Sequence, residues 1–350
     1  MNIVHLEDEP WDSGIAHYAL TLAGEQARRG HRVAFWGRSS SPILARAREL
    51  GLAARGGACG ALGWLSLPVL RGELAAFSPR IVNAHTGSAH ALAVALAPRG
   101  AAVVRTRGDA RPPRSNALTR WTAARTAVQI AANSSLKADL ESCFPSAAVR
   151  LVPQGIEGLK SPTPMPAVPV VGMIARLDPV KGHDVLLDAA LALKSQVSGL
   201  RIACAGEGSQ FERLSARIRD EGLEGTAMLL GRVPEPWKFL SACRIGVVAS
   251  LGSEAVSRAA LEWMSAGRPV VATRVGGITD LVVDGVTGLL IPPGDAGALS
   301  AAIKALLADS GRATLMGRAG RELWEKNYSL APFYLRTQEV YEEALRRLPR

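Results

Sequence analysis

The sequence predicts an α/β protein of two Rossmann-like domains, and three observations support this prediction. Short apolar runs alternate with segments of helical apolar spacing along most of the chain, as in doubly wound parallel sheets. The alternation stops once, at a proline-rich stretch, and then starts again. The length of 350 residues suits two domains of this kind.

The composition restricts the class of protein. The chain is 48% hydrophobic and 21% charged, which is typical of a globular protein. Its net charge of +10 favours an acidic partner, namely a nucleotide, an anionic lipid or a nucleic acid. Low aromatic content and the lack of a nucleic-acid-binding module argue against the last.

Cysteine usage and the terminus predict a cytoplasmic protein. Four cysteines without C-x-x-C spacing predict buried free thiols in a reducing compartment and no metal site; they are Cys59, Cys143, Cys204 and Cys243. Residues 1–6 lack the basic and apolar regions of a signal peptide, and no apolar run is long enough to span a bilayer.

The first domain opens with a strand at residues 2–6, a polar loop and a helix at 15–29. Gly14 closes this loop, where a glycine lets the backbone approach a ligand at the helix N-terminus, or simply makes a turn. Further strands at 81–84, 101–105, 128–131 and 149–152 also end on polar loops. His85 follows one of them directly, at the edge where ligands of such sheets bind.

Two surface features of the first domain allow two interpretations each. The segment 99–125 contains seven arginines and a single acidic residue, Asp109. They form either a solvated basic face or an anion site for an acidic acceptor, in which Arg107 would take part. Residues 62–77, which include Trp64, are apolar and form either core, as we expect, or an interfacial helix that touches a membrane.

Prolines at 162, 164, 166 and 169 mark the domain boundary. We therefore expect an N-terminal domain at 1–160, a linker at 161–169 and a C-terminal domain at 170–326. The remaining residues, 327–350, should form a helix that crosses back to the first domain.

The second domain places cations and carboxylates in loops at strand ends. Arg176 and Lys181 lie five positions apart in a strand-to-helix loop, a spacing that suits a diphosphate. Glu254 follows the strand at 245–249, and Glu262 lies in the next helix, 256–266. A buried carboxylate is costly without partners, and sugar or ribose hydroxyls would supply them. Alternatively, Glu254 is an N-terminal helix charge and Glu262 a solvated side chain.

With these residues in place, the second domain resembles the family 4 retaining glycosyltransferases of the GT-B fold, in which two Rossmann-like domains face a central cleft. The resemblance covers nearly all of 170–308. It is carried by a series of segments in family order: 175–182, 205–208, 230–233, 253–262, 267–277, 284–288 and 293–295. In the first domain, residues 13–31 and 83–85 are similar but less specific.

The resemblance implies roles for individual residues. Arg176 and Lys181 would bind the donor's diphosphate, Glu262 its ribose and Glu254 its sugar. The other implied donor contacts are Gly14, His85, Val233 and the backbone of Ala255, Val256 and Ser257. Arg258 departs from the usual aliphatic residue and would add a third cation, while Glu-Ala-Val-Ser replaces the usual Glu-Gly-Phe-Gly at 254–257.

The implied activity is transfer of a sugar from a UDP- or GDP-sugar to an acceptor, without metal or cofactor. We expect the acceptor to be a saccharide or envelope glycolipid such as lipopolysaccharide core, with contact to the inner face of an anionic membrane and none to nucleic acid. A GT-B epimerase or phosphorylase is the alternative. A dinucleotide oxidoreductase is disfavoured, because Gly206-Glu207-Gly208 lacks the third glycine of the fingerprint.

Overall fold

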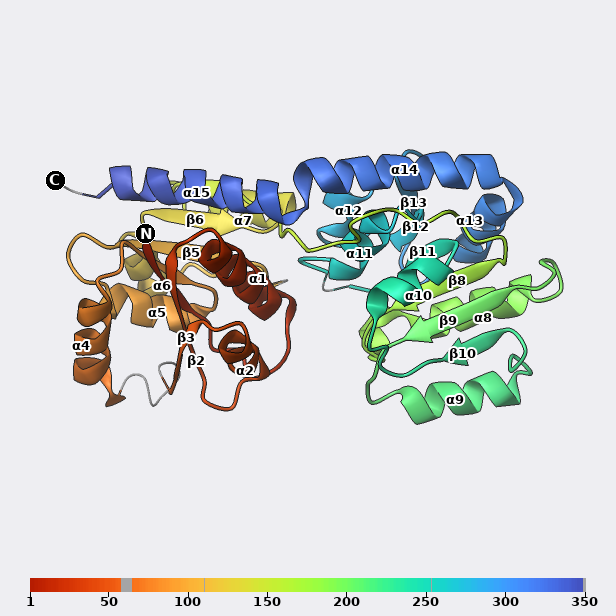
Figure 1. Ribbon diagram of the computed structural model, residues 1–350, viewed down its shortest axis with the longest axis horizontal. Helices are drawn as coiled ribbons and strands as arrows, with labels where there is room; N and C mark the ends of the chain where they lie inside the picture. Colours follow the sequence, from red (N-terminus) through yellow and green to blue (C-terminus); the bar gives the residue numbers. More distant parts are fainter. Residues whose placement is uncertain (58–64, 110, 253, 349–350) are drawn as a thin grey trace. The chain divides into compact units, whose positions relative to one another are not determined.

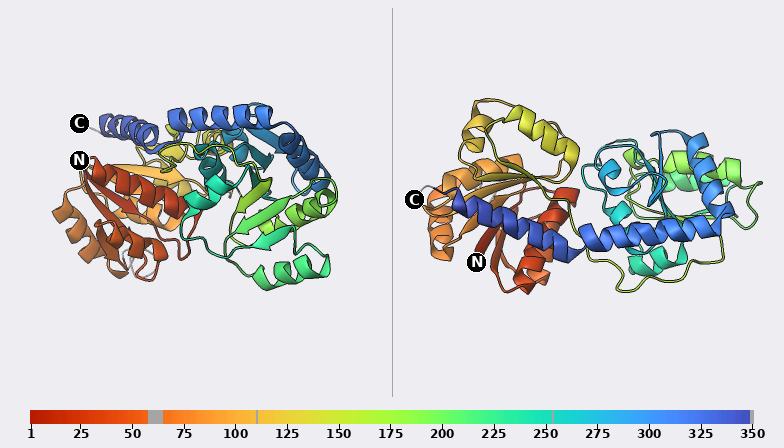
Figure 2. Two further views of the ribbon diagram at one scale, coloured as in Figure 1. Left: turned by 45° about the vertical axis from the view of Figure 1, so that its right-hand side comes forward. Right: turned by 90° about the horizontal axis from the view of Figure 1, so that it is seen from above.

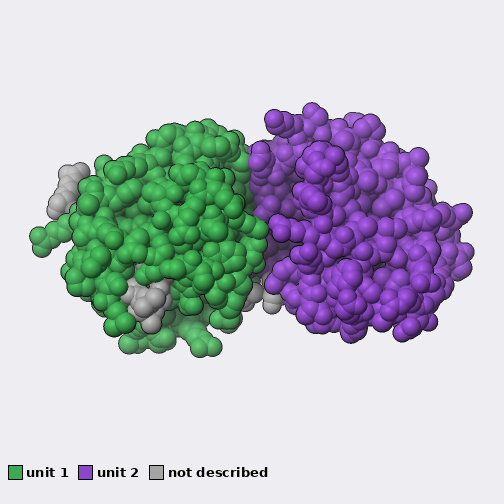
Figure 3. Space-filling model, turned by 60° about the horizontal axis from the view of Figure 1, so that its bottom comes forward, with its two compact units in different colours: residues 1–155, 330–350 green, residues 156–329 purple. Residues whose placement is uncertain are grey.

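A computed structural model describes residues 1–57, 65–109, 111–252 and 254–348. The chain divides into two units, shown in different colours in Figure 3. Unit 1 comprises Met1–Gly155 and Leu330–Arg350, and unit 2 comprises Ile156–Ser329. The chain therefore passes between the units twice, and its last helix belongs to the first unit.

Unit 1 is built on a parallel sheet of seven strands within the described residues, in the order β3-β2-β1-β4-β5-β6-β7 (Figure 1). Its central strands are buried on both faces, which agrees with their continuous apolar sequences. The strands are β1 (Asn2–Leu6), β2 (Arg32–Gly37), β3 (Ala53–Gly56), β4 (Ile81–Ala84), β5 (Ala102–Arg107), β6 (Val128–Ala131) and β7 (Val149–Leu151).

Helices cover both faces of this sheet (Figure 2). On one face α1 packs against α2 and α15, and α4, α5 and α6 pack side by side on the other. The helices are α1 (Gly14–Arg28), α2 (Pro42–Glu49), α4 (Leu67–Phe77), α5 (Gly87–Leu96), α6 (Ala117–Ala123), α7 (Ser134–Cys143) and α15 (Leu330–Arg346). Side chains of Ser13, Thr86, Asn116 and Asn133 cap four of them, as their positions before the helices favour.

Unit 2 repeats this plan with a parallel sheet in the order β10-β9-β8-β11-β12-β13. Helices α8, α9 and α13 pack on one face, and α10, α11 and α12 on the other. The strands are β8 (Val170–Ile174), β9 (Arg201–Ala205), β10 (Ala227–Leu229), β11 (Ile245–Val248), β12 (Val270–Thr273) and β13 (Gly288–Ile291). The helices are α8 (His183–Leu193), α9 (Phe211–Asp220), α10 (Pro236–Ala242), α11 (Arg258–Ser265), α12 (Ile278–Leu281), α13 (Ala296–Ala308) and α14 (Ser310–Asn327).

The proline-rich stretch expected as a linker, 161–169, falls inside unit 2. The Arg268 side chain is buried and donates to the backbone oxygens of Thr163, at 3.1 Å, and Pro164, at 3.2 Å. A second arginine, Arg321, donates to the backbone oxygen of Leu159 at 2.5 Å. These two side chains hold the extended segment against unit 2, so its stiffness does not separate the units.

The apolar stretch at 62–77 is core in part. Leu70 and Leu74 of α4 are fully buried, whereas Val69 of the same helix is 58% exposed and Leu65, which precedes the helix, is 82% exposed. Trp64 lies outside the described residues. Among the described residues, no helix combines the length and apolar character that crossing a bilayer needs.

The predicted burial of the cysteines is confirmed in part. Cys204 and Cys243 are buried free thiols, and burial raises the pKa of each to about 12. Cys143 is half-buried instead, because it ends the surface helix α7. Cys59 lies outside the described residues.

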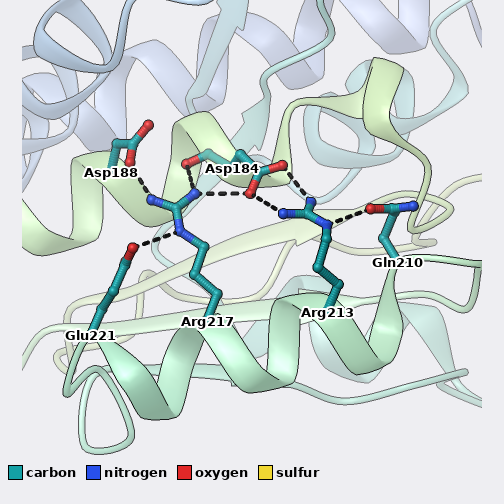
Figure 4. Close-up of polar contacts among 6 residues, drawn as sticks. All are labelled: Asp184, Asp188, Gln210, Arg213, Arg217 and Glu221. Atoms are coloured by element: carbon teal, nitrogen blue, oxygen red, sulfur yellow. Dashed lines mark hydrogen bonds and ion pairs between the residues drawn. The ribbon is translucent and has the colours of Figure 1, made fainter.

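An ion-pair network joins α9 to the first turns of α8 (Figure 4). Arg217 binds Asp184, Asp188 and Glu221, and Arg213 donates to both carboxylate oxygens of Asp184. The hydrogen bonds from Arg213 hold the pKa of Asp184 below its usual value. Helix α8 begins directly after the loop that carries Lys181. The ion pairs therefore hold in place the helix that follows this loop.

We expect Arg217→Ala to lower the free energy of unfolding by about 1 to 2 kcal/mol at pH 7, because one partly buried guanidinium serves three carboxylates. Arg219→Ala on the same helix is the control, since the structure gives the Arg219 side chain no partner among the described residues. Urea titrations measure both values. Equal losses in the two variants would contradict a stabilising role for the network.

Candidate functional site

Each sheet has one point where the strand order reverses direction. In unit 2 this point lies between β8 and β11, and in unit 1 between β1 and β4. Loops that leave such neighbouring strands diverge to opposite faces and open a crevice at the carboxyl edge, where ligands of open α/β sheets bind. Arg176 and Lys181 follow β8, Glu254 follows β11 and His85 follows β4, so several of the expected site residues lie in loops at these two points.

The loop after β8 packs tightly against the end of β11. Gly182 adopts a φ of +75°, and a Cβ at this position would lie 2.0 Å from the carbonyl oxygen of Ala249. The amide of Leu251 donates to the carbonyl oxygen of Val180 at 2.8 Å. Only a glycine permits this conformation together with this approach, which brings Lys181 to the β11 loop.

Lys181, Glu254 and Ser250 form a hydrogen-bonded network at the carboxyl edge. The Lys181 ammonium donates to Oε1 of Glu254, and Ser250 Oγ donates to the same oxygen at 2.5 Å. The Glu254 side chain is 6% exposed, and that of Lys181 is 22% exposed. Burial of this carboxylate is compensated by both partners, and Thr273 fixes Ser250 through a 2.6 Å hydrogen bond to its carbonyl oxygen.

The loop after β12 fixes the backbone of Glu254. The amide of Gly277 donates to the Glu254 carbonyl oxygen at 2.6 Å. At Gly276 the φ is +49°, and a Cβ would lie 2.3 Å from that same oxygen. The loop after β12 thus holds the backbone of Glu254. Lys181, after β8, and Ser250, after β11, hold its carboxylate.

The other charged residues expected in unit 2 also form pairs. Arg176 is 64% exposed and lies 2.9 Å from Asp178 in its own loop. Arg258 Nε donates to Glu262 Oε1 at 2.8 Å across one turn of α11, and the Glu262 side chain is 16% exposed. Glu254 is thus a buried carboxylate with a cation as partner, and Glu262 is a half-buried one paired with Arg258 on its own helix.

The segment before α11 is irregular. The helix begins at Arg258, two residues later than the sequence predicts, so Ala255, Val256 and Ser257 form a bend ahead of its N-terminus. Ser253 lies outside the described residues. Val233, expected near the nucleobase, is half-buried against the core cluster that contains Trp263.

In unit 1, His85 follows β4 as expected but is not solvent-facing. It is 1% exposed, and its Nε2 lies 2.9 Å from Nδ1 of His5 on the neighbouring strand β1. Burial lowers the pKa of His85 well below its usual value. Gly14 is the first residue of α1, and the side chain of Ser13 accepts a hydrogen bond from the Ala16 amide at 3.2 Å.

A buried carboxylate connects the two loops of the unit 1 edge. Asp8, the second residue after β1, accepts hydrogen bonds from the hydroxyls of Thr86 and Ser88 at the start of α5. Asp8 is 5% exposed. This contact parallels that of Glu254, because in both units a carboxylate bridges the loops on either side of the strand-order reversal.

The arginines between 99 and 125 do not form one exposed basic surface. Arg105 is 4% exposed and donates to the carbonyl oxygens of Ala84 and Thr106, and burial lowers its pKa to about 9. Arg107 is bound to Asp109 at 2.7 Å. The exposed members are Arg99, Arg111, Arg114, Arg120 and Arg125.

Sequence reasoning gave no role to His5, Asp8 or Ser250, nor to Gln26 of α1, whose Oε1 lies 2.8 Å from His5 Nε2. His5 and Gln26 carry a usable signal, since each is a polar side chain at an otherwise apolar position of its strand or helix. Asp8 and Ser250 carry none, because their partners depend on which strands are neighbours. Within the described ranges, no three His, Cys, Asp or Glu side chains are grouped so that they could hold a metal ion.

Two family models match this chain, one on each unit. The model "Glycosyltransferase Family 4" matches residues 13–157, and "Glycosyl transferases group 1" matches 162–323. The crystal structure of Anabaena Alr3699/HepE in complex with UDP-glucose superposes with a TM-score of 0.79 at 19% identity, covering 98% of this chain and 99% of that chain. At this identity the likeness concerns the fold.

Curated relatives match a shorter part of the chain. A GDP-mannose-dependent alpha-(1-6)-phosphatidylinositol monomannoside mannosyltransferase of Mycolicibacterium smegmatis is 35% identical over 162 residues, which is 44% of this chain and 42% of the relative. The lipopolysaccharide core biosynthesis glycosyltransferase LpsE of Rhizobium meliloti is 29% identical over 167 residues, 48% of this chain and 47% of the relative. The match thus spans less than half of either relative.

We expect Lys181→Met to lower the free energy of unfolding by about 2 to 3 kcal/mol, because it leaves the buried Glu254 carboxylate without its cation. Adding Glu254→Gln in the same chain should restore part of the loss, since the neutral amide still accepts from Ser250. Urea titrations of the two single variants and the double variant measure this coupling. A double variant with the summed loss of the singles would show that the two side chains do not interact.

Proposed function

Because the chain belongs to the glycosyltransferase family that these two models describe, and has its two-domain GT-B fold, we propose that it transfers a sugar from a nucleoside diphosphate to an acceptor hydroxyl. We propose further that the anomeric configuration is retained. One observation carries the proposal: the buried Glu254 carboxylate and the Lys181 ammonium lie bonded at the strand-order reversal of unit 2. A sugar nucleotide offers hydroxyls to the carboxylate and a diphosphate to the cation.

In this proposal, donor binding exchanges the partners of the charged residues. Lys181 leaves Glu254 for the diphosphate, and Glu254 accepts hydrogen bonds from the sugar hydroxyls. Arg176 is exposed enough to turn from Asp178 to the same diphosphate. Glu262 accepts from the ribose hydroxyls, and Arg258, which already contacts Glu262, adds positive charge beside them.

The reaction breaks the bond between the anomeric carbon and the phosphate oxygen. The bonding electrons leave with the diphosphate, whose new charge is stabilised by Lys181, Arg176 and the N-terminus of α11. The acceptor oxygen attacks the same face of the sugar that the diphosphate leaves, and its proton passes to the departing phosphate oxygen. A side-chain base, a metal and a further cofactor are therefore unnecessary in the proposed mechanism.

The donor we propose is a UDP- or GDP-sugar. One relative is named for GDP-mannose, and the superposed Anabaena structure is a complex with UDP-glucose. Half-buried Val233 and the exposed Arg232 beside it would meet the base in either case. An epimerase or phosphorylase would act on the donor without transfer to an acceptor hydroxyl, so an acceptor-dependent product distinguishes it.

The acceptor we propose is an envelope glycan or glycolipid, reached at the cytoplasmic face of a membrane. Both relatives above are named for lipid-linked products. The surface around α6, residues 111–125, fits an anionic bilayer, because it exposes four arginines and no acidic residue occurs from 111 to 138. Leu118 and Trp121 are 58% and 39% exposed there, and the Arg125 guanidinium lies 5.0 Å from the Trp121 ring centre.

Incubation with a panel of UDP- and GDP-sugars and glycolipid acceptors should release free nucleoside diphosphate with one donor. We expect Lys181→Ala to lower the rate at least about tenfold, since a charged contact to the leaving group is lost. Lys194→Ala, at the far end of α8, is the matched control. A panel without any turnover, or equal rates for the two variants, would contradict the proposal.

We expect the protein to co-sediment with vesicles that contain phosphatidylglycerol but not with pure phosphatidylcholine, and less so as salt rises. Leu118→Ser/Trp121→Ser should weaken this binding at least about tenfold. Trp237→Ala is the matched control, because Trp237 is 48% exposed beside Lys238 but lies next to the acidic Glu235. Unchanged binding of the double variant, or equally tight binding to single-stranded RNA, would rule out this membrane surface.

A further inference from the structure

Trp11 is an exposed aromatic residue in the β1 loop, residues 7–13, which joins β1 to α1. It is 56% exposed and lies at the carboxyl edge of the unit 1 sheet, where ligands of open α/β sheets bind. A single exposed apolar side chain is common on protein surfaces. The meaning of Trp11 therefore depends on how its loop is held and on which polar groups lie beside it.

The β1 loop is anchored on both sides of Trp11. Before it, the Glu9 amide donates to a carboxylate oxygen of Glu7 at 2.8 Å. After it, the carboxylate of Asp12 lies 2.7 Å from Nε2 of His17 on α1. The indole is thus exposed on a segment that is already held, so a ligand that packs on it has little loop ordering to offset.

The carboxyl groups next to Trp11 lack hydrogen-bond partners. Oε2 of Glu7 and Oε2 of Glu9 are buried and have no partner among the described residues, which is unusual in a folded protein. Burial raises the pKa of Glu7 to about 8, and burial together with the charge of Asp8 raises that of Glu9. Glu9 is only half-buried, so rotation of its side chain can present Oε2 to a ligand. A hydroxyl group would satisfy it in either protonation state, because a hydroxyl both donates and accepts.

Two exposed arginines from neighbouring loops act on the same side chain. Arg38, directly after β2, and Arg111, after β5, both lower the pKa of Glu9, so their charges lie near it. Arg107 holds the second of these loops, because it donates to the carbonyl oxygen of Arg111 at 3.0 Å and to Asp109 at 2.7 Å. Loops after three strands thus bring hydrogen-bond donors and acceptors together around Glu9.

We propose that the β1 loop is a platform for a pyranose ring of the acceptor, with Trp11 stacked on the C–H face of the ring and Glu9 accepting from its hydroxyls. A pyranose has an apolar C–H face and a rim of hydroxyls, which match an exposed indole next to a carboxylate. Arg38 and Arg111 donate to other oxygens of the ring. The inference rests on the proposed function for the role of this ring as acceptor, whereas the binding of a saccharide needs no transfer.

The charges beside Trp11 distinguish the platform from the membrane surface proposed at α6. Residues 7–12 contain four acidic residues and no basic one, so an anionic bilayer repels this loop, whereas a neutral sugar does not. Trp121 lies instead beside Arg125, whose guanidinium is 5.0 Å from the ring centre. Arg111 is the first residue of the membrane surface, so the platform adjoins it, as binding of a glycolipid headgroup needs.

The test is fluorine NMR on the full-length protein labelled with 5-fluorotryptophan, with the Trp11 signal assigned from Trp11→Phe. Methyl glycosides of glucose, mannose, galactose and N-acetylglucosamine are added to the protein alone and with UDP or GDP. We expect at least one to shift the Trp11 signal with a Kd of about 1 to 10 mM. The signal of Trp237, which is 48% exposed, should not move. Every pyranose has a C–H face, so no Trp11 shift with any of them at about 100 mM would overturn the proposal.

Variants separate the sugar contact from general effects on the loop. Trp11→Ala should raise the KM for the acceptor about tenfold with kcat and donor KM unchanged, whereas Trp11→Tyr keeps a ring and most of the affinity. Glu9→Gln should weaken glycoside binding about fivefold, because a hydrogen bond to a charged acceptor is lost. Glu49→Gln, exposed at the end of α2, is the matched control. Equal binding by the two glutamine variants would contradict the role of Glu9.

Further arms identify the source of the ring and separate this inference from the proposed function. Tighter binding of the octyl glycoside, below its micelle concentration, than of the methyl glycoside assigns the ring to a glycolipid, and equal binding assigns it to a soluble saccharide. Loss of vesicle binding in Trp11→Ala would make Trp11 a membrane contact and overturn the platform. A Trp11 shift in a protein without transfer activity would sink only the proposed function, and transfer with an unchanged acceptor KM in Trp11→Ala would sink only the platform.

Discussion

The ion pair between Lys181 and Glu254 is the contact on which the candidate donor site depends. It joins the loop after β8 to the loop after β11, the two strands between which the order of the unit 2 sheet reverses. Neither charge is stable in this place alone, because the carboxylate is buried and the ammonium is partly so. The pair therefore preorganises a polar edge of the sheet, and in the proposed mechanism it opens when a donor binds.

The surrounding backbone is shaped to allow this contact. Gly182 lets the first loop approach β11, and Gly276 lets the loop after β12 approach Glu254. The ion pairs of Arg213 and Arg217 hold the first turns of α8, the helix that follows Lys181 in the chain. Unit 1 uses a comparable device, in which Asp8 connects the loops after β1 and β4. In both units, a carboxylate that accepts from hydroxyl or ammonium donors connects the two loops beside the strand-order reversal.

Much of the fold was predictable from the sequence, because alternating apolar runs, caps and turn glycines specify strands and helices locally. The fold class and the family were confirmed, and Lys181 and Glu254 were correctly expected at strand ends. Their direct bond was not foreseen, because nothing local in the sequence states that β8 lies beside β11. The same holds for His85, whose burial follows from the pairing of β4 with β1 and from His5 on that strand.

The central claim is that a diphosphate competes with Glu254 for Lys181. Isothermal titration of free UDP and GDP into wild-type protein and into Glu254→Gln measures this competition without any turnover. The account predicts that the variant binds the preferred nucleoside diphosphate about tenfold more tightly than wild type, since its Lys181 no longer has to leave a carboxylate. Equal or weaker binding by the variant, with clear binding by wild type, would contradict it.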